Sequence, residues 1–201
     1  MPKACTYYLA PQSPYVYLGH QRFAALARQH GAAVDVRPFD LGRVFNTSGG
    51  LPLAKRAPQR QAYRLVELER WSRFLDLPLN LHPAFFPVAG DAAARLIIAA
   101  KLAQGNDAAM ALTGAIGRAV WAEERNIADA GTLSAIAAAA GMDGAALMAG
   151  AGGADVQAEY ERYTDDAIAA NVFGAPWYVV DGVGYWGQDR LDFVERALRQ
   201  S

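Results

Sequence analysis

The sequence predicts an α/β protein whose small sheet is interrupted by a long, all-helical insertion. Three observations lead to this prediction. The N-terminal segment alternates as strand, helix and strand, the middle of the chain is helical and rich in alanine, and the C-terminal segment returns to two strands and a helix. The expected order is therefore βαβ, a helical insertion and then ββα, with no internal repeat.

The N-terminal elements follow from alternation and from helix stop signals. Residues 3–9 are expected to form a strand, and residues 14–30 a helix that ends at Gly31, because glycine readily takes the left-handed conformation that ends helices. Residues 33–37 alternate as the second strand, and a strand–helix–strand order favours a parallel pair. Residues 46–52, Asn-Thr-Ser-Gly-Gly-Leu-Pro, are predicted to be a loop.

Helical spacing of apolar residues begins at Pro58 and continues to Leu77-Pro78. The apolar positions of this helix are Tyr63, Val66, Leu68, Trp71, Phe74 and Leu75. Five further helices are expected: residues 91–104, residues 106–126, one opening at Thr132, one opening at residues 141–143, and residues 156–170.

The C-terminal segment reads as a hairpin followed by a helix. Residues 177–180 and 183–186 are expected to pair around the turn Asp181-Gly182, since Asp-Gly is a common two-residue hairpin turn. Residues 191–199 are expected to close the chain as a helix.

Length and composition fit a single domain, residues 1–201, that needs no disulfide or metal to hold its core. Its core comprises about residues 1–45 and 168–201, and the helical insertion about residues 58–167. A net charge of -1, from 19 basic and 20 acidic residues, gives no electrostatic case for nucleic acid or an anionic membrane. Without a signal segment or an apolar run of membrane-spanning length, a cytoplasmic protein is expected.

The cysteine and histidine content argues against disulfide and metal chemistry. The single cysteine, Cys5, excludes an internal disulfide, and its place in the alternating first strand predicts a small buried apolar residue. The three histidines, His20, His30 and His82, show no metal-ligand spacing, so no metal site is expected.

The tetrapeptide Ser13-Pro14-Tyr15-Val16 follows the first strand at the start of the first helix. A thioredoxin-like oxidoreductase carries Cys-X-X-Cys at this place, but Ser13 and Val16 fill both cysteine positions, which excludes dithiol chemistry there. A hydroxyl and free amides at a helix N-terminus would stabilise an anion such as the thiolate of a cofactor. The alternative is that Ser13 is an ordinary helix cap followed by Pro14.

Three segments together resemble the DsbA-like, glutathione-binding branch of the thioredoxin-like proteins, which holds the kappa-class glutathione transferases and the 2-hydroxychromene-2-carboxylate isomerases. They are residues 13–19, 172–176 and 185–191, and residues 63–71 give weaker support. The string Trp-Gly-Gln-Asp-Arg, residues 186–190, is more similar to the isomerases, and we adopt that assignment. The resemblance implies a DsbA-like thioredoxin fold with a large helical insertion.

The resemblance also implies a glutathione site at the head of the first helix. Ser13, followed by Pro14 and Tyr15, would hold the glutathione sulfur as a thiolate. Ala175 would pair its backbone with the cysteinyl part of glutathione, beside Pro176, which is a cis-proline in this family. Ser13 is therefore the candidate catalytic residue.

The two ends of glutathione are assigned by the same resemblance. Asp189 would receive the γ-glutamyl ammonium, and Gln188 with the adjacent helix start would receive the α-carboxylate. The loop of the family commonly reads Thr/Ser-Gly-Asn, whereas this chain has Ser48-Gly49-Gly50. The side-chain contact is therefore absent at Gly50, where backbone amides would have to replace it.

Candidates for binding the substrate lie between the core and the insertion. Arg60, which matches a basic position of the family, and Lys55 are candidates for a substrate carboxylate; a solvated basic face is the alternative for Lys55 and its neighbour Arg56. Phe85 and Phe86 either form a wall for a flat aromatic substrate or pack the insertion against the core.

The function implied by the resemblance is a glutathione-dependent isomerase. It would convert 2-hydroxychromene-2-carboxylate to trans-o-hydroxybenzylidenepyruvate, or run a related reaction of aromatic-compound catabolism, by reversible addition of a thiolate to a conjugated alkene. The resemblance also implies a homodimer and a small aromatic substrate. Two alternatives are a kappa-like glutathione transferase or peroxidase, and a non-enzymatic DsbA-like protein that binds peptides along the Ala175-Pro176 edge.

Overall fold

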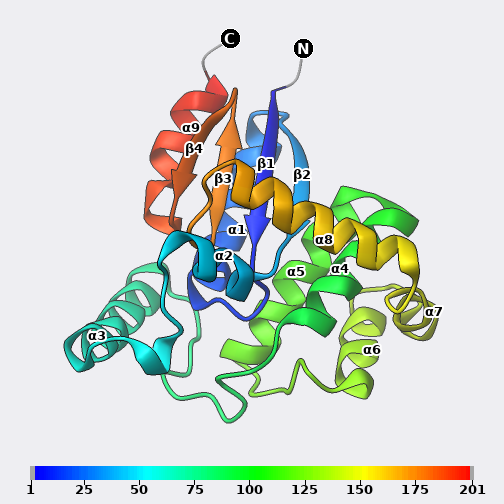
Figure 1. Ribbon diagram of the computed structural model, residues 1–201, viewed down its shortest axis with the longest axis horizontal. Coiled ribbons are helices and arrows are strands. Elements are labelled where there is room, and N and C mark those ends of the chain that lie inside the picture. Colours follow the sequence, from blue (N-terminus) through cyan, green and yellow to red (C-terminus); the bar gives the residue numbers. More distant parts are fainter. Residues whose placement is uncertain (1–2, 200–201) are drawn as a thin grey trace.

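A four-stranded mixed sheet lies at the centre of residues 3–199, the part of the chain that the computed structural model describes (Figure 1). The strand order is β2-β1-β3-β4. Strand β1 runs parallel to β2 and antiparallel to β3, and β3 pairs antiparallel with β4. The strands are β1 (Ala4–Leu9), β2 (Ala33–Pro38), β3 (Trp177–Val180) and β4 (Val183–Trp186). The predicted parallel pair and the predicted hairpin are confirmed.

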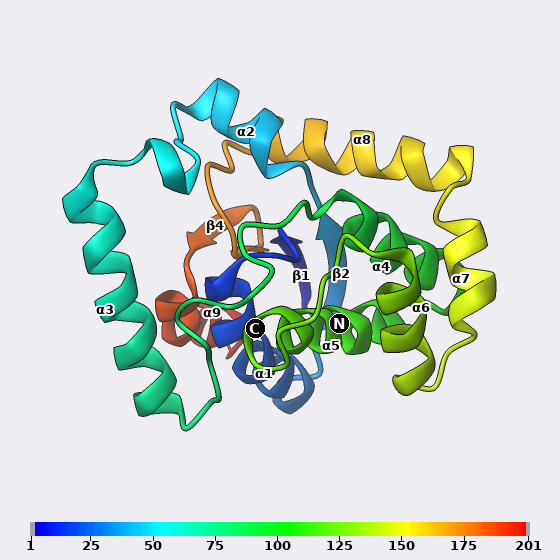
Figure 2. The same cartoon turned by 90° about the horizontal axis from the view of Figure 1, so that it is seen from below.

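Helices cover both faces of the sheet, because successive side chains of β1 point to opposite faces. Tyr7 stacks on Tyr178 with ring centroids 5.2 Å apart and meets Phe23 of α1 (Pro14–Gln29) at 4.8 Å. Tyr8 packs on the other face with Phe39 and with α2 (Leu41–Ser48) and α8 (Ala154–Ala169). Figure 2 shows α2 and α8 on one side of the sheet, and α1 with α9 (Leu191–Arg199) on the other.

Most of the helical insertion lies beyond β2 and extends the same hydrophobic core, whereas α3 (Pro58–Leu75) lies on the opposite side of the sheet (Figure 1). Lys101 ties the insertion to the sheet: its ammonium donates to the Val36 carbonyl at 2.8 Å, to the Tyr163 hydroxyl at 2.8 Å and to the Asp35 carboxylate. None of the helices within residues 3–199 has both the length and the apolar character needed to cross a membrane. The insertion contains α3 (Pro58–Leu75), α4 (Asp91–Gln104), α5 (Asn106–Trp121), α6 (Ala130–Ala139), α7 (Gly144–Gly150) and α8.

The predicted loop at residues 46–52 is wrong in its first half, because helix α2 continues to Ser48. Asp40 starts this helix by accepting hydrogen bonds from the amides of Gly42 and Arg43, at 2.8 and 3.1 Å. The helix ends at Gly49, whose φ of 75° is the left-handed conformation that suits glycine.

The helix predicted to reach residue 126 stops at Trp121. The amides of Glu123 and Arg125 turn back to the carbonyls of Arg118 and Ala119, at 3.1 and 2.8 Å. These bonds satisfy the last carbonyls of α5, so the chain leaves the helix axis there.

The predicted apolar face of α3 is also wrong in part. Tyr63, Val66 and Phe74 are 60%, 47% and 76% exposed, whereas Leu68 is fully buried and Arg64 is 8% exposed. The helix therefore turns the face containing Arg64 and Leu68 inward, four residues apart, which is one helical turn.

Cys5 is fully buried in β1, and burial raises the pKa of its thiol to about 12. The prediction that it is a buried apolar residue is confirmed.

Candidate active site

Ser13 caps the first helix and lies at its N-terminal end. Its amide donates to the Ala10 carbonyl at 2.9 Å, and its hydroxyl oxygen accepts from the Val16 amide at 3.3 Å. Pro14 follows at the first helical position, where its missing N–H costs nothing. The capping role is thus present, and the same geometry leaves the partial positive charge of the helix N-terminus beside the Ser13 hydroxyl.

The Ala175–Pro176 peptide bond is cis, and it lies directly against this helix start. The Ser13 hydroxyl donates to the Ala175 carbonyl at 3.4 Å, near the upper limit for a hydrogen bond. The structure therefore brings together the two sequence segments, 162 residues apart, that were predicted to meet.

The segment after β4 joins the site through the same proline. The Gly187 amide donates to the Pro176 carbonyl at 3.0 Å. Gly187 has a φ of 99°, and a Cβ atom there would lie 2.5 Å from an Asp189 carboxylate oxygen. The positive φ favours glycine at this turn, and the missing Cβ leaves room for the Asp189 carboxylate beside the backbone of residue 187.

The two residues predicted for the ends of glutathione lie in different surroundings. Gln188 is buried, and Arg22 donates to its backbone carbonyl at 3.0 Å and to its side-chain oxygen. Its side-chain oxygen is thus held by Arg22, and the turn η2 (Gln188–Arg190) offers backbone amides instead. Asp189 is exposed and pairs with Arg190 at 2.9 Å.

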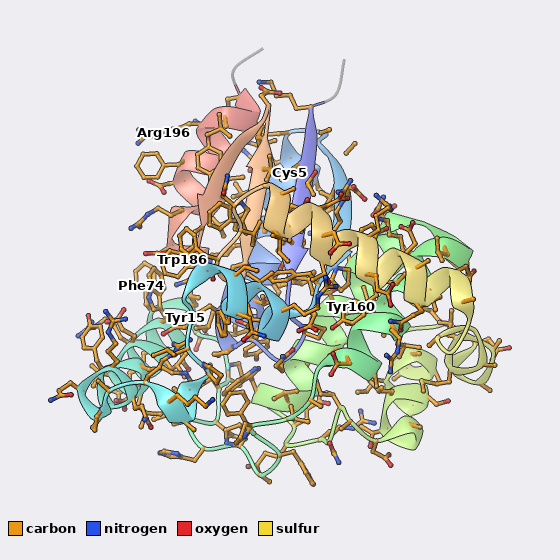
Figure 3. All side chains as sticks on the ribbon, in the orientation of Figure 1. Cys5, Tyr15, Phe74, Tyr160, Trp186 and Arg196 are labelled. Carbon is orange, nitrogen blue, oxygen red and sulfur yellow. The ribbon has the colours of Figure 1, made fainter. Side chains whose placement is uncertain are left out.

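Tyr15 lies among charges of both signs. Burial raises the pKa of the Tyr15 hydroxyl; the charges of Arg64 and Arg56 lower it, and those of Glu67 and Asp189 raise it. The phenol therefore stays protonated at neutral pH and is a hydrogen-bond donor. Figure 3 shows Tyr15 and Trp186 at the end of the sheet that faces α2 and α3.

Gly50, which stands where the resemblance places an asparagine, lies against the ring of Phe45. A Cβ atom at Gly50 would collide with the ring of Phe45 in α2, and the Arg56 guanidinium lies over the same ring at 5.9 Å. Phe45 thus occupies the space that a side chain at position 50 would need.

The predicted substrate residues are only partly assembled. Lys55, in the turn η1 (Leu53–Lys55), and Arg60, near the start of α3, are both exposed. Phe86 is half-buried and packs on Trp121 with ring centroids 4.7 Å apart, so it fits the alternative in which the insertion packs against the core. Phe85 is 44% exposed.

Two aromatic residues beside the cis-proline were not singled out from the sequence. Phe173 meets Trp186 edge-on at 4.7 Å, and Trp186 is 52% exposed. A Cβ atom at Gly174 would lie 2.5 Å from the indole nitrogen of Trp186, so this glycine lets the indole lie close over the backbone. Both aromatics lie within segments that carry the resemblance, but they were given no role there, because their proximity depends on the folding of the hairpin. Arg64, the buried arginine of α3, was also not identified from the sequence as a site residue.

A family model described as the DSBA-like thioredoxin domain matches residues 7–199. The chain belongs to this family. Within it, the chain is similar to the 2-hydroxychromene-2-carboxylate isomerase of Sphingobium xenophagum: 31% identical over 199 residues, 98% of this chain and 99% of the relative. A kappa-class glutathione S-transferase of Caenorhabditis elegans is 35% identical over 88 residues, 42% of this chain and 38% of the relative.

Among solved structures, a 2-hydroxychromene-2-carboxylate isomerase superposes on this DSBA-like chain with a TM-score of 0.79 and 26% identity, covering 97% of this chain and 94% of the other. The predicted DsbA-like thioredoxin fold and the predicted family are confirmed. The named relatives support isomerase as the enzyme class, as predicted.

Proposed function

We propose that this DSBA-like protein is a glutathione-dependent isomerase acting on 2-hydroxychromene-2-carboxylate or a related intermediate of aromatic-compound catabolism. The observation that carries the proposal is the continuous contact from the Ser13 hydroxyl through Ala175 and Pro176 to Gly187. It surrounds a helix N-terminus that holds a hydroxyl where a redox relative has a thiol. The names of the relatives support the reaction class and the involvement of glutathione.

The residues present fit glutathione in their donor chemistry. The Ser13 hydroxyl donates over 3.4 Å to Ala175, a long bond that is readily exchanged for one to a sulfur anion. The Asp189 carboxylate suits an ammonium, and the first amides of η2 suit a carboxylate. When bound, glutathione would supply the thiolate that adds to the alkene and leaves after rotation.

The residues of the chain would lower the thiol pKa and hold the substrate. Ser13 and the first amides of α1 stabilise negative charge on sulfur. Tyr15, kept protonated by burial, is a hydrogen-bond donor for the ligand of this site. Trp186 and Phe173 provide an exposed aromatic surface for a flat ring.

The proposed function predicts that glutathione acts as a catalyst and is not consumed. Glutathione at a small fraction of the substrate concentration should support many turnovers, because the thiolate leaves again after rotation. The test is to follow 2-hydroxychromene-2-carboxylate by absorbance and to titrate free thiol at the end. One thiol lost for each product would contradict the proposal in favour of a transferase.

Two further outcomes separate the alternatives. Oxidised glutathione formed only with added peroxide would identify a peroxidase. Absence of glutathione binding, measured by calorimetry, would leave the peptide-binding alternative, which needs only the Ala175–Pro176 edge.

Asp189→Ala is expected to raise the KM for glutathione by about tenfold with a smaller effect on kcat, since it removes a charged partner of the γ-glutamyl ammonium. Steady-state kinetics at varied glutathione concentration measure both constants. Asp192→Ala is the matched control, because Asp192 is also exposed and begins the following helix. Equal effects of the two substitutions, or an effect on kcat alone, would exclude this role for Asp189.

A further inference from the structure

A buried arginine faces the candidate site from α3. The guanidinium of Arg64 lies over the ring of Phe86 at 5.2 Å and over the ring of Trp121 at 5.6 Å. The side chain is 8% exposed, and burial lowers its pKa although arginine stays charged. Its Nη2 atom is buried and has no hydrogen-bond partner within residues 3–199.

The surroundings of Arg64 do not balance its charge. No ion pair among the described residues involves Arg64, whereas Arg70 and Arg73 of the same helix pair with Glu67 and Glu69. Contacts with aromatic rings stabilise a cation but leave the N–H groups unsatisfied. A buried guanidinium without a partner is costly, and none of residues 3–199 supplies an anion to the buried Nη2 of Arg64.

The location of Arg64 indicates which anion this is. Of the neighbouring charges, Arg64 has the largest effect on the pKa of Tyr15, which lies in the first turn of α1, two residues after Ser13. Helix α3 packs against α1, so the Arg64 guanidinium and the Tyr15 hydroxyl are near enough for their charges to interact on the side of α1 that begins at Ser13. Both are donors, and a planar guanidinium can donate to both oxygens of a carboxylate.

We propose that Arg64, with Tyr15 as a second donor, binds the carboxylate of a ligand in this site. This inference rests on the proposed function and specifies the chemistry of its ligand. The carboxylate belongs either to the 2-oxo acid arm of the substrate or to the glycine end of glutathione. Arg64 would thereby perform the role that the sequence assigned to Arg60 or Lys55, both of which are exposed.

Binding to purified protein tests the proposal without relying on turnover. We would titrate wild type, Arg64→Gln and the control Arg73→Gln with trans-2-hydroxycinnamate and its neutral amide, and with glutathione and γ-glutamylcysteine, which lacks glycine. Loss of a charged hydrogen bond should weaken the carboxylate ligand by about 10- to 100-fold in Arg64→Gln. Arg73→Gln should bind like wild type, because Arg73 is exposed and pairs within its own helix.

The pattern of losses distinguishes the two sources. Weaker binding of the cinnamate, with the amide unchanged, assigns Arg64 to the substrate carboxylate. Weaker binding of glutathione, with γ-glutamylcysteine unchanged, assigns it to the glycine carboxylate. Unchanged binding of both acids in Arg64→Gln, or no binding of either acid to wild type at millimolar concentration, would overturn the proposal. Since no substrate is converted, the result stands whether or not the isomerase reaction is observed.

Thermal unfolding of Arg64→Met provides a second measurement. Replacing an unpaired buried charge by an apolar side chain should leave the Tm of the free protein unchanged or raise it. The increase in Tm that the carboxylate ligand gives in wild type should be lost. A large fall in the Tm of the free protein would show that Arg64 is a structural residue and would overturn the proposal.

Discussion

Ser13→Ala is expected to raise the pKa of glutathione bound at the head of α1 and to slow turnover by about 10- to 1000-fold, the scale of losing one donor to a developing anion. The hydroxyl lies at a helix N-terminus, 3.4 Å from the Ala175 carbonyl, from which it can turn to the sulfur. The ultraviolet absorbance of the thiolate, titrated on the complex, measures the pKa directly. An unchanged thiol pKa in Ser13→Ala would exclude this role.

The capping role of Ser13 must be separated from its proposed catalytic role. Loss of the bond from the Val16 amide should cost about 1 kcal/mol of folding stability. Ser13→Asp restores a good helix cap but places a negative charge beside the thiolate, so it should fold like wild type and remain nearly inactive. Recovery of activity in Ser13→Asp would show that only the cap matters. Ser134→Ala, in α6 of the insertion, is the control for a serine outside the site.

Folding stability is expected to fall by about 3 kcal/mol between pH 6.5 and pH 4 because of His20 alone. This residue of α1 is 6% exposed, its Nδ1 lies 3.5 Å from the Tyr7 hydroxyl, and burial lowers its pKa from 6.5 to about 4. Below pH 6.5 the unfolded chain takes up a proton at His20 that the folded chain refuses until about pH 4. The contribution of neutral His20 is therefore complete above pH 6.5 and is lost as the pH falls.

Urea unfolding at pH 7.5 and pH 4.5 measures this effect. His20→Gln should lose most of the pH dependence that wild type shows over this interval, although it is less stable than wild type at pH 7.5. His82→Gln, at an exposed histidine, should keep the wild-type dependence. The same dependence in His20→Gln as in wild type would show that the protonation of other groups causes the fall.

Local sequence signals predicted the parts of the site that depend on local structure. Ser13 and Pro14 are a cap and a first helical residue, and both roles follow from backbone geometry alone. Asp40 was an equally valid cap signal for α2, but Gly42 and the polar residues 46–48, Asn-Thr-Ser, obscured the helix. The juxtaposition of Ala175 with Ser13 was accessible only through the resemblance of ordered segments, because no local rule connects residues so far apart.

Arg64 could not be found from the sequence because helical spacing on α3 permits two inward faces. Tyr63, Val66 and Phe74 formed the more apolar face, yet the tertiary structure buries the face of Arg64 and Leu68. What decides between the faces is packing against Phe86 and Trp121, which lie in other segments. The orientation of α3 about its own axis therefore explains both the exposed apolar side chains and the buried Arg64.

The hydrogen bond between Ser13 and Ala175 also has a consequence for biosynthesis. Ser13 is translated early, but its partner is added 162 residues later. A ribosome-bound chain that has completed the helical insertion still lacks the second wall of the site. Under the proposed function, the complete glutathione site therefore forms only after residues 175 and 176 have been synthesised and have folded against the head of α1.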